Sequence, residues 1–311
     1  MDERRVVLVL VGPTAVGKTA TSLLLAKELN GEIVSADSRQ VYRGMDIGTA
    51  KVTPEERGQI PHHLIDIRNP DETISLGEYK ELADTVIADI LNRGRLPILV
   101  GGTGQYVRAV VEGWQIPRVP PQPELRRELE ALAAREGKEA LFARLKELDP
   151  LSAQTIDYRN LRRVIRAIEV TLVAGRPFSE LQTKQPPPWR ILQIGLTRPR
   201  ERLYARADAR IEAMFQAGWA AEVQHLLDQG YTPELPSFGS LGYREVAAYL
   251  AGEYDLEEAK MRIRRSTRAF IRRQYNWFRP TDSRIHWFDL NEVDPETVLR
   301  GVKTSLFSAE T

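Results

Sequence analysis

A phosphate-binding loop near the start of the chain restricts what this sequence can fold into. Residues 12–19 read GPTAVGKT, a complete match to the G-x-x-x-x-G-K-[ST] pattern. The apolar segment Val6–Val11 precedes the loop, and a helix is expected over Thr19–Leu29. A simple glycine turn is the alternative, but the strand–loop–helix setting is the one that the phosphate pattern requires. We therefore predict a protein that binds a diphosphate or polyphosphate.

Each part of this loop has an expected contact with phosphate. Its glycines allow backbone N–H groups to turn inward around phosphate oxygens, and the start of the helix adds partial positive charge. Lys18 is expected to reach a terminal phosphate, and the hydroxyl of Thr19 is expected to hold Mg²⁺. The loop alone does not identify the phosphate compound or its reaction.

Composition excludes several other classes of protein. Apolar residues make up 42% of the chain and charged residues 28%, with a net charge of +1, as in an ordinary soluble globular protein. The absence of cysteine excludes disulfides and cysteine-zinc sites, and no two histidines have zinc-ligand spacing. We see no signal peptide and no apolar run long enough to span a bilayer. A cytoplasmic protein without a membrane partner is expected.

Strands and helices alternate over the first hundred or so residues, which predicts a parallel sheet with helices on both faces. The expected strands are Val6–Val11, Glu32–Ser35 and Leu96–Val100, with a short fourth candidate at His63–Ile67, and the expected helices are Thr19–Leu29 and Leu76–Asn92. Ligands of such sheets bind at the carboxyl ends of the strands. Because the phosphate loop, Asp37 and Gly101–Gly104 all follow strands at that edge, we expect them to converge on one site.

Two proline clusters, residues 117–123 and 186–188, bracket a segment that is almost wholly helical in character. We predict an inserted helical domain at residues 121–187 and a phosphate-loop core at residues 1–120 and 188–311. Further core elements are expected as a strand at Ile191–Leu196 and helices at 200–229, 243–251 and 256–278. Residues 291–311 carry no motif.

Arginines are concentrated in two of the expected helices. Arg159, Arg162, Arg163 and Arg166 recur at helical spacing, which predicts one basic face on the inserted domain. The second concentration lies between Arg262 and Arg279, where aromatic residues alternate with the arginines and acidic residues are absent. A solvated helix face with acidic partners inside the protein would explain either stripe alone. Two such stripes beside a phosphate loop instead favour binding of a nucleic-acid backbone.

The carboxylate that a phosphate-loop hydrolase usually places at a strand end is missing. The strand Leu96–Val100 ends in Gly101-Gly102. Asp37, two residues beyond the strand Glu32–Ser35, is better placed, although a helix cap or a loop salt bridge would explain it equally well. Asp66 lies in an apolar segment and is interpreted as structural. This pattern argues against simple nucleotide hydrolysis.

Taken together, these residues resemble the tRNA dimethylallyltransferase (tRNA isopentenyltransferase) family over roughly residues 6–280. The most distinctive part is the run DSRQVYRGMDIGTAK at residues 37–51. The phosphate loop, GGTG at 101–104, GYRE at 242–245 and the arginine-rich residues 264–279 add to the resemblance. Where family members often have Asn-Asp, this chain has Tyr158-Arg159-Asn160. The lack of cysteine indicates the bacterial type, without the zinc module of eukaryotic relatives.

The resemblance implies transfer of a dimethylallyl group from dimethylallyl diphosphate to N6 of adenosine 37, beside the tRNA anticodon. Asp37 is then the general base, with Thr103 in the catalytic set, and Mg²⁺ is held at Thr19. The implied diphosphate-binding residues are Gly12, Thr14, Ala15, Val16, Gly17, Lys18, Thr19 and Arg210. The implied tRNA-binding residues are Asp37, Ser38, Arg39, Gln40, Thr103, Arg126, Arg159, Asn160, Leu161, Arg162, Arg163 and Arg166.

We expect a monomer that binds the anticodon stem-loop of tRNA. The alternatives are an adenylate isopentenyltransferase acting on free AMP, a phosphate-loop kinase of a small molecule, and an RNA-binding protein switched by a nucleotide. The arginine face of the inserted domain favours tRNA over AMP. The missing strand-end carboxylate counts against the kinase.

Overall fold

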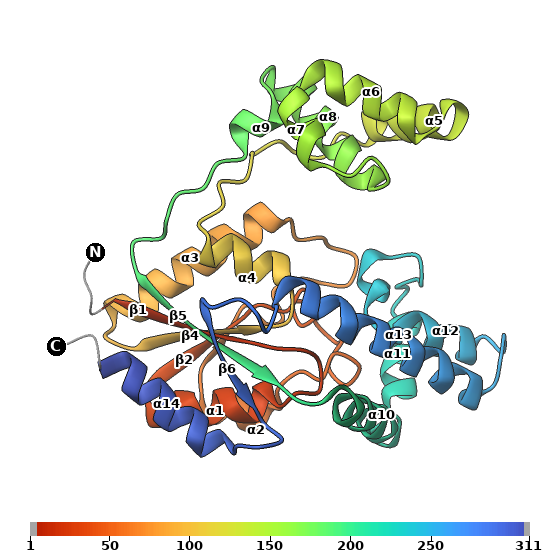
Figure 1. The fold of residues 1–311 in the computed structure, drawn as a ribbon. Helices are drawn as coiled ribbons and strands as arrows, with labels where there is room; N and C mark the ends of the chain where they lie inside the picture. The colour runs from red at the N-terminus through yellow and green to blue at the C-terminus, as the bar shows by residue number, and fades with distance from the viewer. Residues whose placement is uncertain (1–4, 308–311) are drawn as a thin grey trace. The chain divides into compact units, whose positions relative to one another are not determined.

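The computed structural model describes residues 5–307; residues 1–4 and 308–311 lie outside the described part. Its centre is a six-stranded sheet of order β3-β2-β4-β1-β5-β6, in which every pair of neighbours is parallel (Figure 1). The strands are β1 (Val6–Val11), β2 (Gly31–Ser35), β3 (His62–His63), β4 (Leu96–Gly101), β5 (Arg190–Thr197) and β6 (Ile285–Asp289). The predicted parallel α/β fold is confirmed.

Helices cover both faces of this sheet, because successive side chains of a strand point to opposite sides. Leu8 and Leu10 of β1 pack into the core formed with α1 (Lys18–Glu28) and α14 (Pro295–Phe307). Val7 and Val9 pack into the core formed with α3 (Leu76–Asn92) and α4 (Gly104–Val111). All residues of β1 are buried, which explains why its sequence is continuously apolar rather than alternating.

The remaining core helices are α2 (Pro54–Gln59), α10 (Arg200–Gln216), α11 (Trp219–Asp228), α12 (Tyr243–Leu250) and α13 (Leu256–Trp277), with a 3₁₀ turn at Pro236–Gly239. A third hydrophobic cluster joins Trp219 and Tyr243 of these helices to Val41 and Met45 of the loop after β2. The long loop after β2 is therefore packed against helices rather than extended into solvent.

Several expected elements differ in the structure. The strand expected at His63–Ile67 ends after two residues, because Leu64 and Asp66 adopt φ angles of 61° and 56°. The helix expected over 200–229 is interrupted at Gly218, whose φ of 98° favours glycine. Both β6 and α14 lie in segments for which no element was predicted.

Residues Glu112–Pro186 form a compact unit of their own, separate from Met1–Val111 and Pro187–Thr311. Its helices are α5 (Pro123–Glu136), α6 (Lys138–Leu148), α7 (Pro150–Thr155), α8 (Leu161–Ala174) and α9 (Phe178–Leu181). They enclose a separate hydrophobic core that includes Leu129, Leu141 and Ile168. Within residues 5–307, no helix has the length and apolarity that crossing a membrane requires.

Candidate active site at the carboxyl edge of the sheet

The phosphate loop connects β1 to α1 through an unusual backbone path. Gly12 and Gly17 have φ angles of 151° and 120°, and a Cβ on Gly12 would lie 2.5 Å from the carbonyl oxygen of Leu196. Both positions therefore require glycine. Gly17 caps α1 without a side-chain hydrogen bond, so the cap residue does not occupy the first N–H groups of the helix.

Lys18 lies inside this loop, where its Nζ donates hydrogen bonds to the carbonyl oxygens of Gly12 (2.9 Å) and Pro13 (3.0 Å). Burial lowers the pKa of Lys18 to about 8; the charge of Asp37 opposes this shift and that of Arg210 adds to it. Burial also lowers the pKa of Arg210, again with Asp37 acting in the opposite direction. Lys18, Asp37 and Arg210 thus interact electrostatically, although they come from three different parts of the core.

Three side chains that hold the phosphate loop were not among the residues assigned to it from the sequence. Arg206 of α10 donates from Nε to the carbonyl oxygen of Ala15 (2.9 Å), and Arg198 donates from Nε to that of Val16 (3.0 Å). Gln274 of α13 accepts a hydrogen bond from the backbone N–H of Thr14 (2.8 Å). The one-turn spacing of Arg206 and Arg210 was a signal for the first of these contacts, and the helical spacing of Gln274 with Ile263 and Trp277 indicated a core-facing position for the third.

Asp37 begins the loop after β2. Its Oδ1 accepts a hydrogen bond from the backbone N–H of Arg39 (2.8 Å). The neighbouring Ser38 donates its N–H to the hydroxyl of Thr103 (3.0 Å), and that hydroxyl contacts the Ser38 Oγ (3.3 Å). The backbone N–H of Thr103 donates to the Ala36 carbonyl oxygen (3.2 Å). The structure therefore brings Asp37 and Thr103 together, as the sequence suggested.

The distinctive run at residues 37–51 is held by a half-buried side chain of α11. Glu222 of α11 accepts hydrogen bonds from the N–H groups of Asp46 (2.8 Å), Ile47 (2.6 Å) and Gly48 (3.2 Å). The hydroxyl of Tyr243 also donates to Glu222, at 2.6 Å. One carboxylate therefore satisfies three consecutive backbone donors of the loop. No pattern in the sequence pointed to Glu222.

A buried lysine, Lys51, holds the carboxyl-terminal end of residues 37–51 in place. The side chain of Lys51 is 3% exposed and pairs with Asp46 and, at 2.6 Å, with Asp66. Asp66 also pairs with Arg57 at 2.6 Å, which agrees with its interpretation as a structural residue. Gln40 bonds to the backbone carbonyl oxygens of Thr49 and Ala50. The loop is thus braced at both ends.

In the helical unit, the prediction of a single arginine face is wrong for Arg159. Helix α8 begins at Leu161 with Asn160 as its N-cap, whose side chain accepts a hydrogen bond from the N–H of Arg163. Arg159 precedes the helix and pairs with Asp157 at 2.8 Å. Arg162 and Arg163 are exposed and have no acidic partner within residues 5–307.

Two other arginines of this unit share an internal partner. The fully buried carboxylate of Glu169 pairs with Arg126 at 2.8 Å and with Arg166 at 2.6 Å. It also accepts the backbone N–H of Gln122 (2.7 Å). Burial raises the pKa of Glu169, but these hydrogen bonds outweigh it and bring the pKa to about 2. For Arg166, the alternative of an acidic partner inside the protein therefore holds, and Arg126, which the resemblance places among the tRNA-binding residues, has the same internal partner.

The arginines of α13 likewise fall into two groups, those with an acidic partner and those without one in the described part of the chain. Arg264 and Arg268 pair with Glu212 and Asp208 of α10, whereas exposed Arg265 and Arg273 have no acidic partner in the described part of the chain. The helix borders two surface hollows of about 530 and 250 Å³, and neither contains a residue of the phosphate loop.

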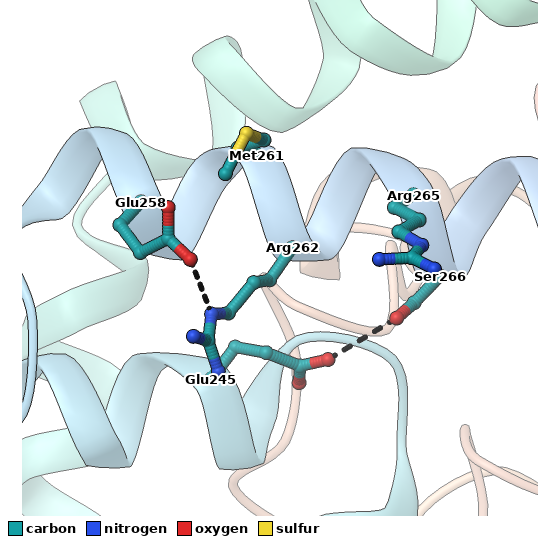
Figure 2. Close-up of a pocket in the computed structure, with 6 residues that line it drawn as sticks. All are labelled: Glu245, Glu258, Met261, Arg262, Arg265 and Ser266. Atoms are coloured by element: carbon teal, nitrogen blue, oxygen red, sulfur yellow. Dashed lines mark hydrogen bonds and ion pairs between the residues drawn. The ribbon is translucent and has the colours of Figure 1, made fainter.

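Figure 2 shows the larger hollow between α12 and α13. Arg262 pairs there with Glu258 at 2.7 Å, and Ser266 bonds to Glu245 at 3.3 Å. Arg265 lines both hollows. The larger hollow is thus lined by two arginines and two glutamates, and Arg265 is its arginine without an acidic partner in the described part of the chain.

A magnesium ion bound at the phosphate loop would take most of its ligands from the bound substrate and from water, and few from the protein. No group of three or more histidine, aspartate or glutamate side chains within residues 5–307 could hold a metal. Mg²⁺ commonly keeps several waters and uses few protein oxygens together with substrate phosphates. The exposed side chain of Thr19, at the first turn of α1, makes no hydrogen bond to another described residue. It fits this role.

The fold and this site define an α/β phosphate-loop protein with lysine, arginine and aspartate gathered at the carboxyl edge of its sheet. The sequence model described as IPP transferase matches residues 40–281. The chain belongs to the IPP transferase family, which confirms the resemblance seen in the sequence.

Named relatives agree with this assignment. A tRNA dimethylallyltransferase of Chloroflexus aurantiacus is 58% identical over 272 residues, covering 88% of this chain and 92% of that one. The tRNA isopentenylpyrophosphate transferase structure of Bacillus halodurans has a TM-score of 0.72 and 42% identity, covering 97% of both chains. A eukaryotic dimethylallyltransferase structure, described as acting on tRNA, has a TM-score of 0.78 and 26% identity, covering 97% of this chain and 78% of that one.

Proposed function

We propose that this protein transfers a dimethylallyl group from dimethylallyl diphosphate to N6 of adenosine 37 in tRNA and releases diphosphate. The observation that carries the proposal is the phosphate loop, with Lys18 inside it, at the same edge of the sheet as the carboxylate of Asp37. It combines a cation for a diphosphate with a carboxylate for a proton. The names of the relatives, tRNA dimethylallyltransferase and tRNA isopentenylpyrophosphate transferase, support the same reaction.

On the acceptor side, the exocyclic amine of adenine is a poor nucleophile because its lone pair is delocalised into the ring. As the new C–N bond forms, the amine becomes acidic and must lose a proton. Asp37 is the proposed acceptor, since one of its oxygens is held by Arg39 N–H and the other has no hydrogen-bond partner in the described part of the chain. Such general-base assistance contributes about 10²–10⁴-fold.

On the donor side, cleavage of the allylic C–O bond leaves its electron pair, and therefore negative charge, on the diphosphate. Lys18, Arg210 and the first N–H groups of α1 stabilise this charge. Lys18 would exchange its present bonds to the Gly12 and Pro13 carbonyl oxygens for phosphate oxygens. Mg²⁺ at Thr19, when bound, would neutralise part of the same charge.

The RNA must present its target base outside the stack. Enzymes that modify a base commonly flip it into the site, and the proposed receiving residues are Ser38, Arg39 and Gln40, which follow Asp37 in the chain. The exposed Arg162 and Arg163, and Arg265 of α13, would contact phosphates. We propose that the partner is the anticodon stem-loop, and that the protein acts as a cytoplasmic monomer.

Incubation with radiolabelled dimethylallyl diphosphate and separate acceptors tests the proposal. We expect label in unmodified tRNA, and none in the same tRNA carrying guanosine at position 37. Label in AMP would indicate an adenylate isopentenyltransferase. Phosphoryl transfer from ATP to a small molecule would indicate a kinase, and tRNA binding without transfer under all conditions would indicate a binding protein.

A further inference from the structure

A single buried amide joins the two loops that form the candidate site. Gln274 is 4% exposed, and its Oε1 accepts the N–H of Thr14 in the phosphate loop at 2.8 Å. Its Nε2 donates to the carbonyl oxygen of Gly102, at 3.3 Å. The two partners determine which end of the amide is oxygen, because Thr14 N–H can only donate and the carbonyl can only accept.

The loop that contains Gly102 is shaped to receive α13. A Cβ on Gly102 would lie 2.2 Å from Nε2 of Gln274, and a Cβ on Gly104 would lie 2.2 Å from the ring of Trp277. Gln274 and Trp277 are separated by about one helical turn and face the same side of α13. Gly102 and Gly104 are therefore needed for close approach to this helix.

A further contact links the loop of Gly102 to the loop of the proposed base, Asp37. Thr103 follows directly and receives the N–H of Ser38 at 3.0 Å, next to Asp37. An unbroken series of short contacts thus leads from Thr14, through Gln274 and Thr103, to the loop of Asp37. The phosphate loop is the proposed leaving-group end of the reaction, and Asp37 is its acceptor end.

We propose that Gln274 is a positioning residue that sets the distance between the phosphate loop and the loop of Asp37. The inference rests on the proposed function, because it assigns those two ends. Gln274 itself touches neither substrate in this scheme. Displacement of reacting groups by about 1 Å can reduce a rate by about 10²-fold. An internal amide that fixes the distance between the two loops therefore protects the rate of transfer.

The test compares Gln274→Met, which preserves volume and removes both hydrogen bonds, with Asn276→Met, an exposed neighbour on the same helix. We expect Gln274→Met to bind diphosphate within about threefold of the unaltered chain and to transfer about 100-fold more slowly at saturating substrates. Backbone hydrogen exchange should accelerate in both residues 12–17 and residues 101–104. Asn276→Met should change neither rate nor exchange.

A second variant separates the two hydrogen bonds. Gln274→Glu keeps an acceptor for Thr14 N–H but loses the donor to Gly102, so exchange should rise in residues 101–104 and remain near normal in residues 12–17. Transfer within about threefold of normal in Gln274→Met, or unchanged exchange in either loop of that variant, would overturn the proposal. If the unaltered chain transferred nothing to tRNA, the proposed function would fail, whereas the exchange experiment would still decide whether Gln274 couples the loops.

Discussion

The hydroxyl of Thr103 accepts the backbone N–H of Ser38 at 3.0 Å, which ties the loop after β4 to the loop after β2. The two residues are 65 positions apart in the chain and meet because β2 and β4 are neighbours in the sheet. Asp37 immediately precedes Ser38. The orientation of the proposed base therefore depends on a side chain from a different strand end.

Replacing Thr103 with valine should test this dependence, because valine keeps the shape and removes the hydroxyl. The Ser38 N–H would lose its acceptor, at a cost of about 1–3 kcal/mol, and we expect transfer to slow by about tenfold to a hundredfold. Thr85→Val, on the exposed face of α3, is the control. A normal single-turnover rate in Thr103→Val would show that the contact is not needed for the reaction.

Substitution of Asp37 by alanine should reduce turnover by about two to four orders of magnitude, since the proposed proton acceptor is removed. Affinity for dimethylallyl diphosphate should change little. Asp71→Ala, at an exposed loop position, should behave like the unaltered chain. Near-normal turnover of Asp37→Ala, measured at saturating tRNA, would remove Asp37 from this role.

The pKa of Lys18 predicts a pH dependence for diphosphate binding. Because burial lowers this pKa to about 8, the free protein holds Lys18 as a cation at pH 7 and loses that charge as the pH rises through 8. Diphosphate affinity, measured by calorimetry, should therefore fall over this interval. Lys18→Met should bind weakly and lack this fall, whereas exposed Lys27→Met should retain it. An identical pH profile in Lys18→Met would contradict the assignment.

The arginines of the helical unit should separate into two groups. Replacing exposed Arg162 and Arg163 by alanine should weaken tRNA binding and reduce the slope of log affinity against log salt by about 0.7 for each single-strand phosphate that is no longer neutralised. The melting temperature should remain unchanged. Arg166→Ala should instead lower the melting temperature, because it removes a partner of buried Glu169. Reduced stability without a change in salt slope in the double variant would favour a structural role.

Glu222→Gln should show how much the loop after β2 depends on one carboxylate. The substitution replaces one acceptor oxygen with an N–H₂ group that faces backbone donors. Because hydrogen bonds to a charged group contribute about 1.5–3 kcal/mol, urea unfolding should show a decrease in stability of that order, together with slower transfer. Exposed Glu201→Gln is the matched control. Full stability and activity in Glu222→Gln would exclude this bracing role.

Much of the site could be predicted because the residues of the phosphate loop and of its flanking strand and helix are adjacent in the chain. The phosphate loop is contiguous, and its strand and helix flank it directly, so residues 12–19 carry their own structural context. Asp37 and Gly101–Gly104 were placed by a general rule for parallel sheets. By contrast, β6 was not predicted, although Ile285, Trp287 and Phe288 are residue types that favour strands. Its place beside β5 is decided by the packing of the sheet.

The sequence by itself determined the parallel sheet, the phosphate loop and the two arginine-rich segments, since each depends on residues close together in the chain. Only the tertiary structure decided which arginines are neutralised: Arg166 and Arg162 share a helix, but only Arg166 reaches the buried Glu169. It likewise joined Gln274 to Thr14 across 260 positions. Burial and pairing depend on which elements pack together, and spacing along a single helix does not contain that information.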